Sequence, residues 1–271
     1  MKLAALQMVS GMDLGDNLAA ARRLLEEAAA AGAELAVLPE YFCLLGARDT
    51  DKLAIQEPFG TGPIQDFLAR AARELGLWIV GGTLPITVGD GARVRNTCLV
   101  FDPQGDCVAR YDKIHLFRFD NGSERFDEAR VLERGSEPAL FTLAARGGRS
   151  WRVGLSVCYD LRFPELYRAY AAQGADLLLV PSAFTHTTGQ AHWATLLRAR
   201  AIENLAYVLA PAQGGLHANG RRTWGHSMLV DPWGQVLAEQ AEGPACVVGS
   251  LDAGRLDEAR RQLPALEHRL L

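Results

Sequence analysis

The stretch Val153-Gly-Leu-Ser-Val-Cys-Tyr-Asp-Leu-Arg-Phe-Pro-Glu165 decides how the rest of the chain is organised. Residues 153–157 combine small and β-branched side chains without any charge, which is typical of a strand buried on both faces. Pro164 suits the first turn of a helix. Cys158 therefore lies between a strand end and a helix N-terminus, where the positive end of the helix dipole stabilises a thiolate. A nucleophile fits this position, but so does a small buried thiol, as most free cysteines are.

The composition is that of an ordinary globular protein. The 271 residues are 49% hydrophobic and 22% charged, which argues against disorder. The net charge of -4 gives no electrostatic reason to expect nucleic acid or an anionic membrane as a partner. No segment reaches the ~20 uninterrupted apolar residues of a membrane span, and the first residues lack the pattern of an export signal.

The cysteines are odd in number and widely spaced, at positions 43, 98, 107, 158 and 246. This spacing contains no Cys-x-x-Cys pair and fits no disulfide framework. With the missing export signal, it favours a reducing, cytoplasmic location. The chain also lacks a Walker loop, Gly-x-Gly-x-x-Gly and His-Glu-x-x-His, so we expect no nucleotide cofactor and no metal.

The first half alternates predicted strands and helices. Apolar runs predict three buried strands, over residues 2–7, 35–38 and 77–80. Helical spacing and end signals predict two intervening helices, one from Asp16 to Gly32 and one from Thr61 or Gly62 to Gly76. Residues 94–101 and 107–111 flank Asp102-Pro-Gln-Gly105 and predict an antiparallel hairpin.

The second half repeats the first. Gly32-Ala-Glu-Leu-Ala-Val-Leu-Pro-Glu40 is echoed by Gly174-Ala-Asp-Leu-Leu-Leu-Val-Pro-Ser182, and the Asp102 turn by Asp231-Pro-Trp-Gly234. Each half would cover one face of a mixed sheet with helices and leave the other face needing a partner. We therefore expect an α/β fold, a four-layer α-β-β-α sandwich with an internal pseudo-twofold repeat, and a single domain over residues 1–271.

Two segments fall outside this repeat. Residues 114–135 lose periodicity and predict a functional loop. A last helix is predicted over residues 252–261, followed by a leucine-rich tail. We expect this tail to pack on the body or on a neighbouring subunit, because it is too apolar to lie in water. Its leucines are Leu263, Leu266, Leu270 and Leu271.

Two charged residues stand at ends of predicted strands. Glu40 follows an apolar run and a proline, and partly desolvated surroundings there would suit a general base. Lys113 closes the hairpin strand. Each has an ordinary alternative, a solvated loop acid for Glu40 and an edge-strand charge for Lys113. Together with Cys158 they would supply the base, the cation and the nucleophile of an acyl-transfer site.

The same residues carry a resemblance to a known family. Leu38-Pro-Glu40, Lys113-Ile-His-Leu116 and the segment from Cys158 to Glu165 are similar to the Glu-Lys-Cys triad motifs of the nitrilase superfamily of carbon-nitrogen hydrolases. The resemblance covers essentially the whole chain, and it implies that Cys158 is a nucleophile on an α-β-β-α sandwich. It also implies a second glutamate after the lysine. Phe126-Asp-Glu-Ala129 fits that place best and points to Glu128, with Glu124 and Glu133 nearby.

The resemblance implies a mechanism through a thioester. Glu40 takes the proton of Cys158, the thiolate attacks a carboxamide carbon, and ammonia leaves. Water activated by Glu40 then releases the acid. Lys113 and the backbone N–H of Tyr159 would hold the oxyanion, and Glu128 would orient Lys113 or the substrate.

The stretches 181–193, 197–203 and 225–234 resemble the deaminated glutathione amidase branch. That branch and the related ω-amidase type act on amides of 2-oxo acids, so the substrate carboxylates would need cationic or hydroxyl partners. We expect these from loop residues, namely Arg118, Arg125, Thr187 and the Arg221-Arg222 pair, and we expect Ser182 and Phe184 to contact the substrate as well. Arg162 is expected to be structural, pairing with Glu165 or a helix end.

Other readings stay open. A papain-like hydrolase would use His115, His186 or His226 as the base in place of Glu40. A catalytically silent small-molecule binder could share the scaffold. Triad chemistry also permits nitriles and simple aliphatic amides as substrates. The resemblance further implies a homodimer.

Overall fold

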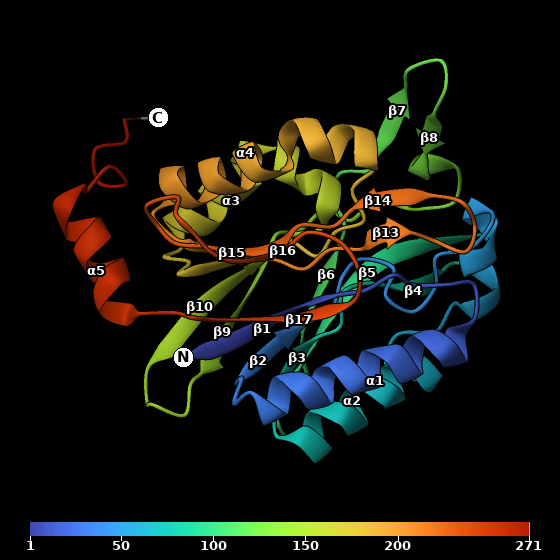
Figure 1. Cartoon of the computed structure of the whole chain (residues 1–271), viewed down its shortest axis with the longest axis horizontal. Helices are drawn as coiled ribbons and strands as arrows, with labels where there is room; N and C mark the ends of the chain where they lie inside the picture. The colour runs from blue at the N-terminus through green and yellow to red at the C-terminus, as the bar shows by residue number, and fades with distance from the viewer. Residues whose placement is uncertain (271) are drawn as a thin grey trace.

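Two β-sheets packed face to face form the centre of the molecule, with helices on both outer sides (Figure 1). The computed structural model describes residues 1–270. In Figure 1, α1 (Leu14–Ala30) and α2 (Pro63–Leu75) cover one sheet. On the opposite side, α3 (Pro164–Ala172) and α4 (His186–Asn204) cover the other. The predicted four-layer α-β-β-α sandwich is therefore confirmed.

The first sheet contains seven strands, which are β1 (Lys2–Gln7), β2 (Leu35–Val37), β3 (Trp78–Val80), β4 (Leu84–Val88), β5 (Arg93–Phe101), β6 (Cys107–Asp112) and β17 (Ala245–Ser250). Their order is β17-β1-β2-β3-β5-β4, with β6 paired to β5. Strands β1, β2 and β3 are parallel, and β5 and β6 form the predicted hairpin. Strand β17 returns from the second half to pair with β1, a crossing that the repeat did not predict.

The second sheet contains six strands, which are β9 (Ala139–Ala144), β10 (Ser150–Leu155), β11 (Leu177–Leu179), β12 (Tyr207–Ala210), β15 (Ser227–Val230) and β16 (Val236–Gln240). Their order is β16-β15-β12-β11-β10-β9. The parallel strands β10, β11 and β12, with α3 and α4 between them, repeat the arrangement of β1, α1, β2, α2 and β3. The two halves of the chain therefore share one plan.

Alternation along β1 shows how the layers are held together. Leu3 and Ala5 face the second sheet and belong to the same core as Val153 of β10. Ala4 and Leu6 point the other way and pack against the helices of the first layer. These four side chains of β1 are fully buried. Burying both faces of a strand fixes its register, so the carboxyl ends of the parallel strands reach defined places in the interior.

The helix ends agree with the sequence except at one cap. α2 begins after Gly62 with Pro63 in its first turn, and it ends at Gly76 in a left-handed conformation, as predicted. α1 begins earlier than predicted. Its N-cap is Asp13, whose carboxylate accepts a hydrogen bond from the Asp16 N–H, so Asp16 lies in the first turn and is not the cap.

The segment predicted as a loop over residues 114–135 contains regular structure. It holds a hairpin of β7 (Arg118–Asp120) and β8 (Arg125–Asp127), then a 3-10 turn, η2 (Glu128–Arg130). Strands this short carry too little periodicity to be recognised in the sequence. In Figure 1 the hairpin projects from the body beyond one end of α4.

The remaining elements lie outside the two large sheets. They are η1 (Asp49–Ile55), η3 (Cys158–Arg162), the paired strands β13 (Gly214–Leu216) and β14 (Arg222–Trp224), and α5 (Ala253–Gln262). Leu263 and Leu270 of the tail are exposed and Leu266 is half-buried, so the predicted packing of the tail on the body is wrong for Leu263 and Leu270. Leu271 lies outside the described residues. Within residues 1–270, no helix combines the length and apolar character needed to cross a membrane.

Substitution of Gly82 tests how closely its backbone packs against Pro39, the residue before Glu40. Its φ is +50°, and a Cβ built there would lie 2.0 Å from the carbonyl oxygen of Pro39. Gly76 has a similar φ of +61° but no atom within 4 Å of its built Cβ, which makes it a matched control. Gly82→Ala should therefore lower the free energy of unfolding by about 1–3 kcal/mol more than Gly76→Ala, because overpacking is added to the same backbone strain. Urea unfolding measures both, and equal losses would contradict the close approach.

Candidate active site

Glu40 directly follows β2 and Pro39, and its side chain is only 1% exposed. Oε1 accepts hydrogen bonds from Asn96 Nδ2 and Lys113 Nζ, each at 2.9 Å. Oε2 accepts a hydrogen bond from the backbone N–H of Ala183, also at 2.9 Å. Because Ala183 belongs to the second half of the chain, both halves orient this carboxylate.

Lys113 follows the last strand of the β5–β6 hairpin, and its side chain is fully buried. Besides Glu40, its Nζ donates to both carboxylate oxygens of Glu128, at 3.0 and 2.8 Å. Burial acts to lower the pKa of Lys113, but the negative charges of Glu128 and Glu40 outweigh it and raise the pKa well above its usual value. Lys113 is therefore a permanent cation between two carboxylates.

Glu128 is the glutamate of the 114–135 segment that reaches this site. Its carboxylate accepts hydrogen bonds from Lys113, from the Tyr41 hydroxyl at 2.9 Å and from the Phe117 N–H at 2.7 Å. Burial acts to raise the pKa of Glu128, whereas the charge of Lys113 and these donors bring it below its usual value. The other two glutamates point elsewhere. Glu124 contacts Thr187 and Glu133 contacts Arg95.

Cys158 begins η3, where the chain leaves β10. Its φ is 49°, in the left-handed region, and its N–H donates to the carbonyl of Pro181 at 3.0 Å. A non-glycine residue in this conformation costs about 1–2 kcal/mol, and such strain gathers at functional sites. The backbone strain therefore favours the functional interpretation of this thiol over the structural one.

Asp160 fixes the turn that carries Cys158. It is fully buried and accepts hydrogen bonds from the N–H of Val157 at 2.8 Å and from the Tyr111 hydroxyl at 2.7 Å. It also contacts the backbone N–H and the Nδ1 of His115, at 3.0 and 2.7 Å. Tyr111 and His115 flank Lys113, so this one carboxylate ties the cysteine turn to the lysine segment.

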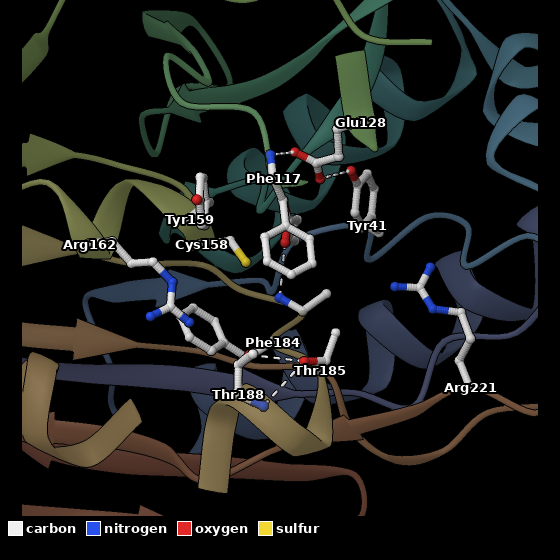
Figure 2. Close-up of a pocket in the computed structure, with 12 residues that line it drawn as sticks. Tyr41, Phe117, Glu128, Cys158, Tyr159, Arg162, Phe184, Thr185, Thr188 and Arg221 are labelled. Atoms are coloured by element: carbon white, nitrogen blue, oxygen red, sulfur yellow. Dashed lines mark hydrogen bonds between the residues drawn. The ribbon is translucent and has the colours of Figure 1, made fainter. Parts of the chain in front are cut away.

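A pocket with about 360 Å³ of empty space opens at these residues (Figure 2). Side chains from both halves line it, namely Glu40, Tyr41, Phe117, Glu128, Cys158, Tyr159, Arg162, Ala183, Phe184, Thr185, Thr188 and Arg221. In Figure 2 the sulfur of Cys158 lies between Arg162 on one side and Arg221 on the other. The pocket therefore presents a nucleophile with a cation on each flank.

Residues 2–261 match the family described as Carbon-nitrogen hydrolase. The chain belongs to this carbon-nitrogen hydrolase family. It is 42% identical over 270 residues to a Synechocystis protein named deaminated glutathione amidase, covering 98% of this chain and 97% of that one. It is 37% identical to the Homo sapiens protein named Omega-amidase NIT2, covering 99% and 94%. The crystal structure of Saccharomyces cerevisiae Nit3, described as a member of the nitrilase superfamily, superposes with a TM-score of 0.88 at 29% identity, covering 100% and 97%. The predicted membership of the nitrilase superfamily is confirmed.

Three of the residues predicted to meet the substrate of this hydrolase line the pocket, and one of them is Arg221. Phe184 forms part of its wall. Tyr159 lines it as well, and within residues 1–270 its backbone N–H makes no hydrogen bond, so it can donate to a ligand. This N–H directly follows Cys158, where an oxyanion donor is needed.

Five other predicted substrate residues lie outside this pocket, and one of them is Arg222, which is exposed and paired with Glu242. Arg118 and Arg125 are exposed on the β7–β8 hairpin, with Arg125 near Asp120. Ser182 is buried and its hydroxyl donates to the carbonyl of Val180. Thr187 is exposed and bonds Glu124. Helical phase explains the last error, because the neighbouring positions 185 and 188 face the pocket.

The prediction for Arg162 was wrong in the opposite sense, because a residue expected to be structural belongs to the pocket. It does not pair with Glu165 but lines the pocket, where its guanidinium lies over the rings of Tyr159 and Phe184 and contacts Nδ1 of His192. Tyr41 and Asn96 were not predicted at all. No sequence signal marks Asn96, which stands between Arg95 and Thr97 in β5.

The three histidines of the papain-like alternative are engaged elsewhere. His115 bonds Asp160 and stacks on Phe163, His226 bonds Glu239, and His186 packs against Trp224. None of the three lines the pocket that holds Cys158. Within residues 1–270, no group of three or more His, Cys, Asp or Glu side chains could hold a metal ion.

The surroundings of Cys158 disfavour a thiolate in the free site, against the stabilisation expected from a helix N-terminus. Burial raises its pKa well above 9.0, and the charge of Glu40 raises it further against the opposing effect of Lys113. Two carboxylates and one ammonium already leave a net negative charge, so a thiolate would add to the repulsion. The thiol therefore needs a base at the moment of attack.

Glu128→Gln should lower kcat by about 100- to 1,000-fold, because an amide would place N–H donors against Lys113 and free it from its position. Steady-state turnover of an amide substrate measures the effect. Glu124→Gln and Glu133→Gln are the matched controls and should stay within tenfold of the parent. A Glu128→Gln enzyme as active as these controls would contradict the role of Glu128 in holding Lys113.

The raised pKa of Cys158 predicts no thiolate titration below pH 9.0 in the free enzyme. The difference in ultraviolet thiolate absorbance between the parent and Cys158→Ser isolates this group, since the other four cysteines cancel. A step within about pH 3.5–7.5, as in cysteines activated by an adjacent cation, would contradict the neutral thiol.

Proposed function

We propose that this carbon-nitrogen hydrolase is a cysteine-dependent amidase that acts on a small 2-oxo acid amide, with deaminated glutathione as its substrate. The observation that carries the proposal is the contact of Lys113 with Glu40 and Glu128 in the pocket of Cys158. These groups supply a base, a cation and a nucleophile. The substrate is supported by the name of the Synechocystis relative.

In the first half of the reaction, Glu40 takes the thiol proton as the sulfur of Cys158 bonds to the amide carbon. The carbonyl electron pair moves to oxygen, and Lys113 Nζ and the Tyr159 N–H stabilise the resulting oxyanion. Glu40 then returns the proton to the nitrogen while the C–N bond breaks. A primary amide releases ammonia, whereas a peptide-like amide such as deaminated glutathione releases an amine. The acyl group stays on sulfur as a thioester.

In the second half, Glu40 takes a proton from water as its oxygen attacks the thioester carbon. The oxyanion returns to the same two donors, and the C–S bond breaks as the thiol recovers a proton. The acid then leaves. Arg162 faces this space from the turn that carries Cys158, and it is the cation we assign to the carboxylate of the acyl group.

An ω-amidase acting on 2-oxoglutaramate is the second candidate. The observation that favours it is the 37% identity to the human protein named Omega-amidase NIT2. Both substrates share a 2-oxo acid on the acyl side, so the catalytic steps would be the same. They differ in the leaving group, which is ammonia in one and a substituted amine in the other.

We also infer a homodimer in the cytoplasm. Large apolar side chains are exposed on one surface, where Ile202 lies against Gly234 beside Trp233. Sedimentation velocity would then give twice the 29.4 kDa chain mass.

The five cysteines are free thiols, as a reducing compartment such as the cytoplasm would keep them.

The proposed function is tested by kcat/KM on deaminated glutathione, 2-oxoglutaramate, a simple aliphatic amide and a nitrile. The first should be hydrolysed best, and comparable rates on all four would contradict the substrate assignment.

Cys158→Ala should abolish turnover while keeping the folded circular dichroism spectrum. Cys107→Ala changes an exposed cysteine away from the pocket and is the matched control. Absence of turnover on every substrate would favour the silent binder.

A further inference from the structure

Two further spaces border the pocket at Cys158 on the side of Tyr41 and Arg221. A second space of about 310 Å³ shares Tyr41, Phe117, Glu128 and Arg221 with it. A third space of about 230 Å³ again includes Tyr41 and Arg221. Lys52 lines both outer spaces but not the inner one. The outer spaces therefore border the pocket of the nucleophile and belong to a region that the proposed chemistry does not use.

This outer region holds two cations without partners. Lys52 lies on η1 with its Nζ 4.7 Å from the centre of the Tyr41 ring, and the Arg221 guanidinium lies 5.2 Å from the centre of the Phe126 ring. Among residues 1–270, neither side chain makes an ion pair within 4.0 Å or a side-chain hydrogen bond. Burial lowers the pKa of Lys52 and the charge of Arg221 adds to this, against the opposing negative charges of Glu128, Asp49 and Glu40. An anion bound between the two cations would offset the burial of Lys52 and its repulsion from Arg221.

The other charged groups facing this region are already accounted for. Glu128 is occupied by Lys113, and Arg48 is paired with Asp51. Asp49 and Asp127 also line the outer spaces, but neither comes within ion-pairing distance of Lys52 or Arg221. The ammonium and the guanidinium are therefore the donors left for a ligand.

One residue links the backbones of the two segments that carry the cations. Asn219 Oδ1 accepts a hydrogen bond from the Arg221 N–H at 2.9 Å. Asn219 Nδ2 donates to the carbonyls of Leu45 and Gly46, at 3.1 and 2.7 Å, in the segment that leads into η1. The loop bearing Arg221 and the segment bearing Lys52 are thus joined before any ligand arrives, which reduces the entropy cost of binding.

We propose that Lys52 and Arg221 form a subsite for a carboxylate on the leaving amine of the substrate. This inference rests on the proposed function. Arg162 lies on the opposite side of Cys158 from Arg221 (Figure 2). The acyl end, which is the shorter arm, fits between Cys158 and Arg162 in the inner pocket. The longer arm reaches past Tyr41, and a terminal carboxylate there meets the two free cations. The preferred substrate class is an elongated amide with an anionic group at each end.

Binding tests the subsite without depending on turnover. Calorimetry on the Cys158→Ala protein compares deaminated glutathione with its C-terminal amide, which has the same shape but no terminal charge. The carboxylate should bind about 10- to 100-fold more tightly. Adding Lys52→Met and Arg221→Gln should bring this ratio close to one. Arg222→Gln, which removes an exposed arginine paired with Glu242, is the matched control and should keep the ratio.

Three results would overturn the subsite. The first is an affinity ratio of carboxylate to amide near one in the parent, and the second is an affinity ratio that the double variant leaves unchanged. The third is an equal loss of affinity for both ligands in the double variant, which would assign the cations to the acyl carboxylate. Turnover by the unmodified enzyme distinguishes failure of the subsite from failure of the proposed function. Hydrolysis of both compounds with no preference removes the subsite alone, whereas charge-dependent binding without hydrolysis removes the amidase alone.

Discussion

The buried ammonium of Lys113 between Glu40 and Glu128 is the interaction on which the site depends. Removing any one of three such charges from water costs several kcal/mol, and mutual attraction offsets this only when the geometry satisfies every donor and acceptor. Three separate elements converge to bring these charges together, the end of β2, the end of β6 and the η2 turn. Removing one member would leave an unpaired buried charge, so the group holds these elements in a fixed arrangement.

Burial and the same charges explain why the pKa of the nucleophile is raised. A cysteine paired with one cation gains a stabilised thiolate. Here burial raises the pKa of Cys158 most, and the charge of Glu40 raises it further against the opposing effect of Lys113. The helix dipole inferred from the sequence is a weaker effect, about 0.3–1 kcal/mol in most settings. A neutral thiol is less open to oxidation, and it turns nucleophilic only when Glu40 accepts its proton.

The sequence supported the layers and the three central residues for a physical reason. Buried parallel strands carry continuous apolar runs, and the residue after such a run lies at a strand end, so Glu40 and Cys158 could be placed without knowing any contact. Pocket walls are different. Thr185 and Thr188 face the pocket while Thr187 does not, and this depends on the phase of α4 against β14. Arg118 and Arg125 are loop cations in sequence, but the hairpin they form points them to solvent.

The internal repeat has a use that the sequence suggested only in part. Glu40 and Ser182 occupy equivalent strand ends, but the hydroxyl of Ser182 turns back to Val180. It is the next residue, Ala183, whose backbone N–H crosses to the carboxylate of Glu40. The second half thus contributes the nucleophile through Cys158 and a donor to the base through its backbone. Any shift of one sheet against the other would lengthen that hydrogen bond and move the base away from the thiol, so the packing between the sheets sets the catalytic geometry.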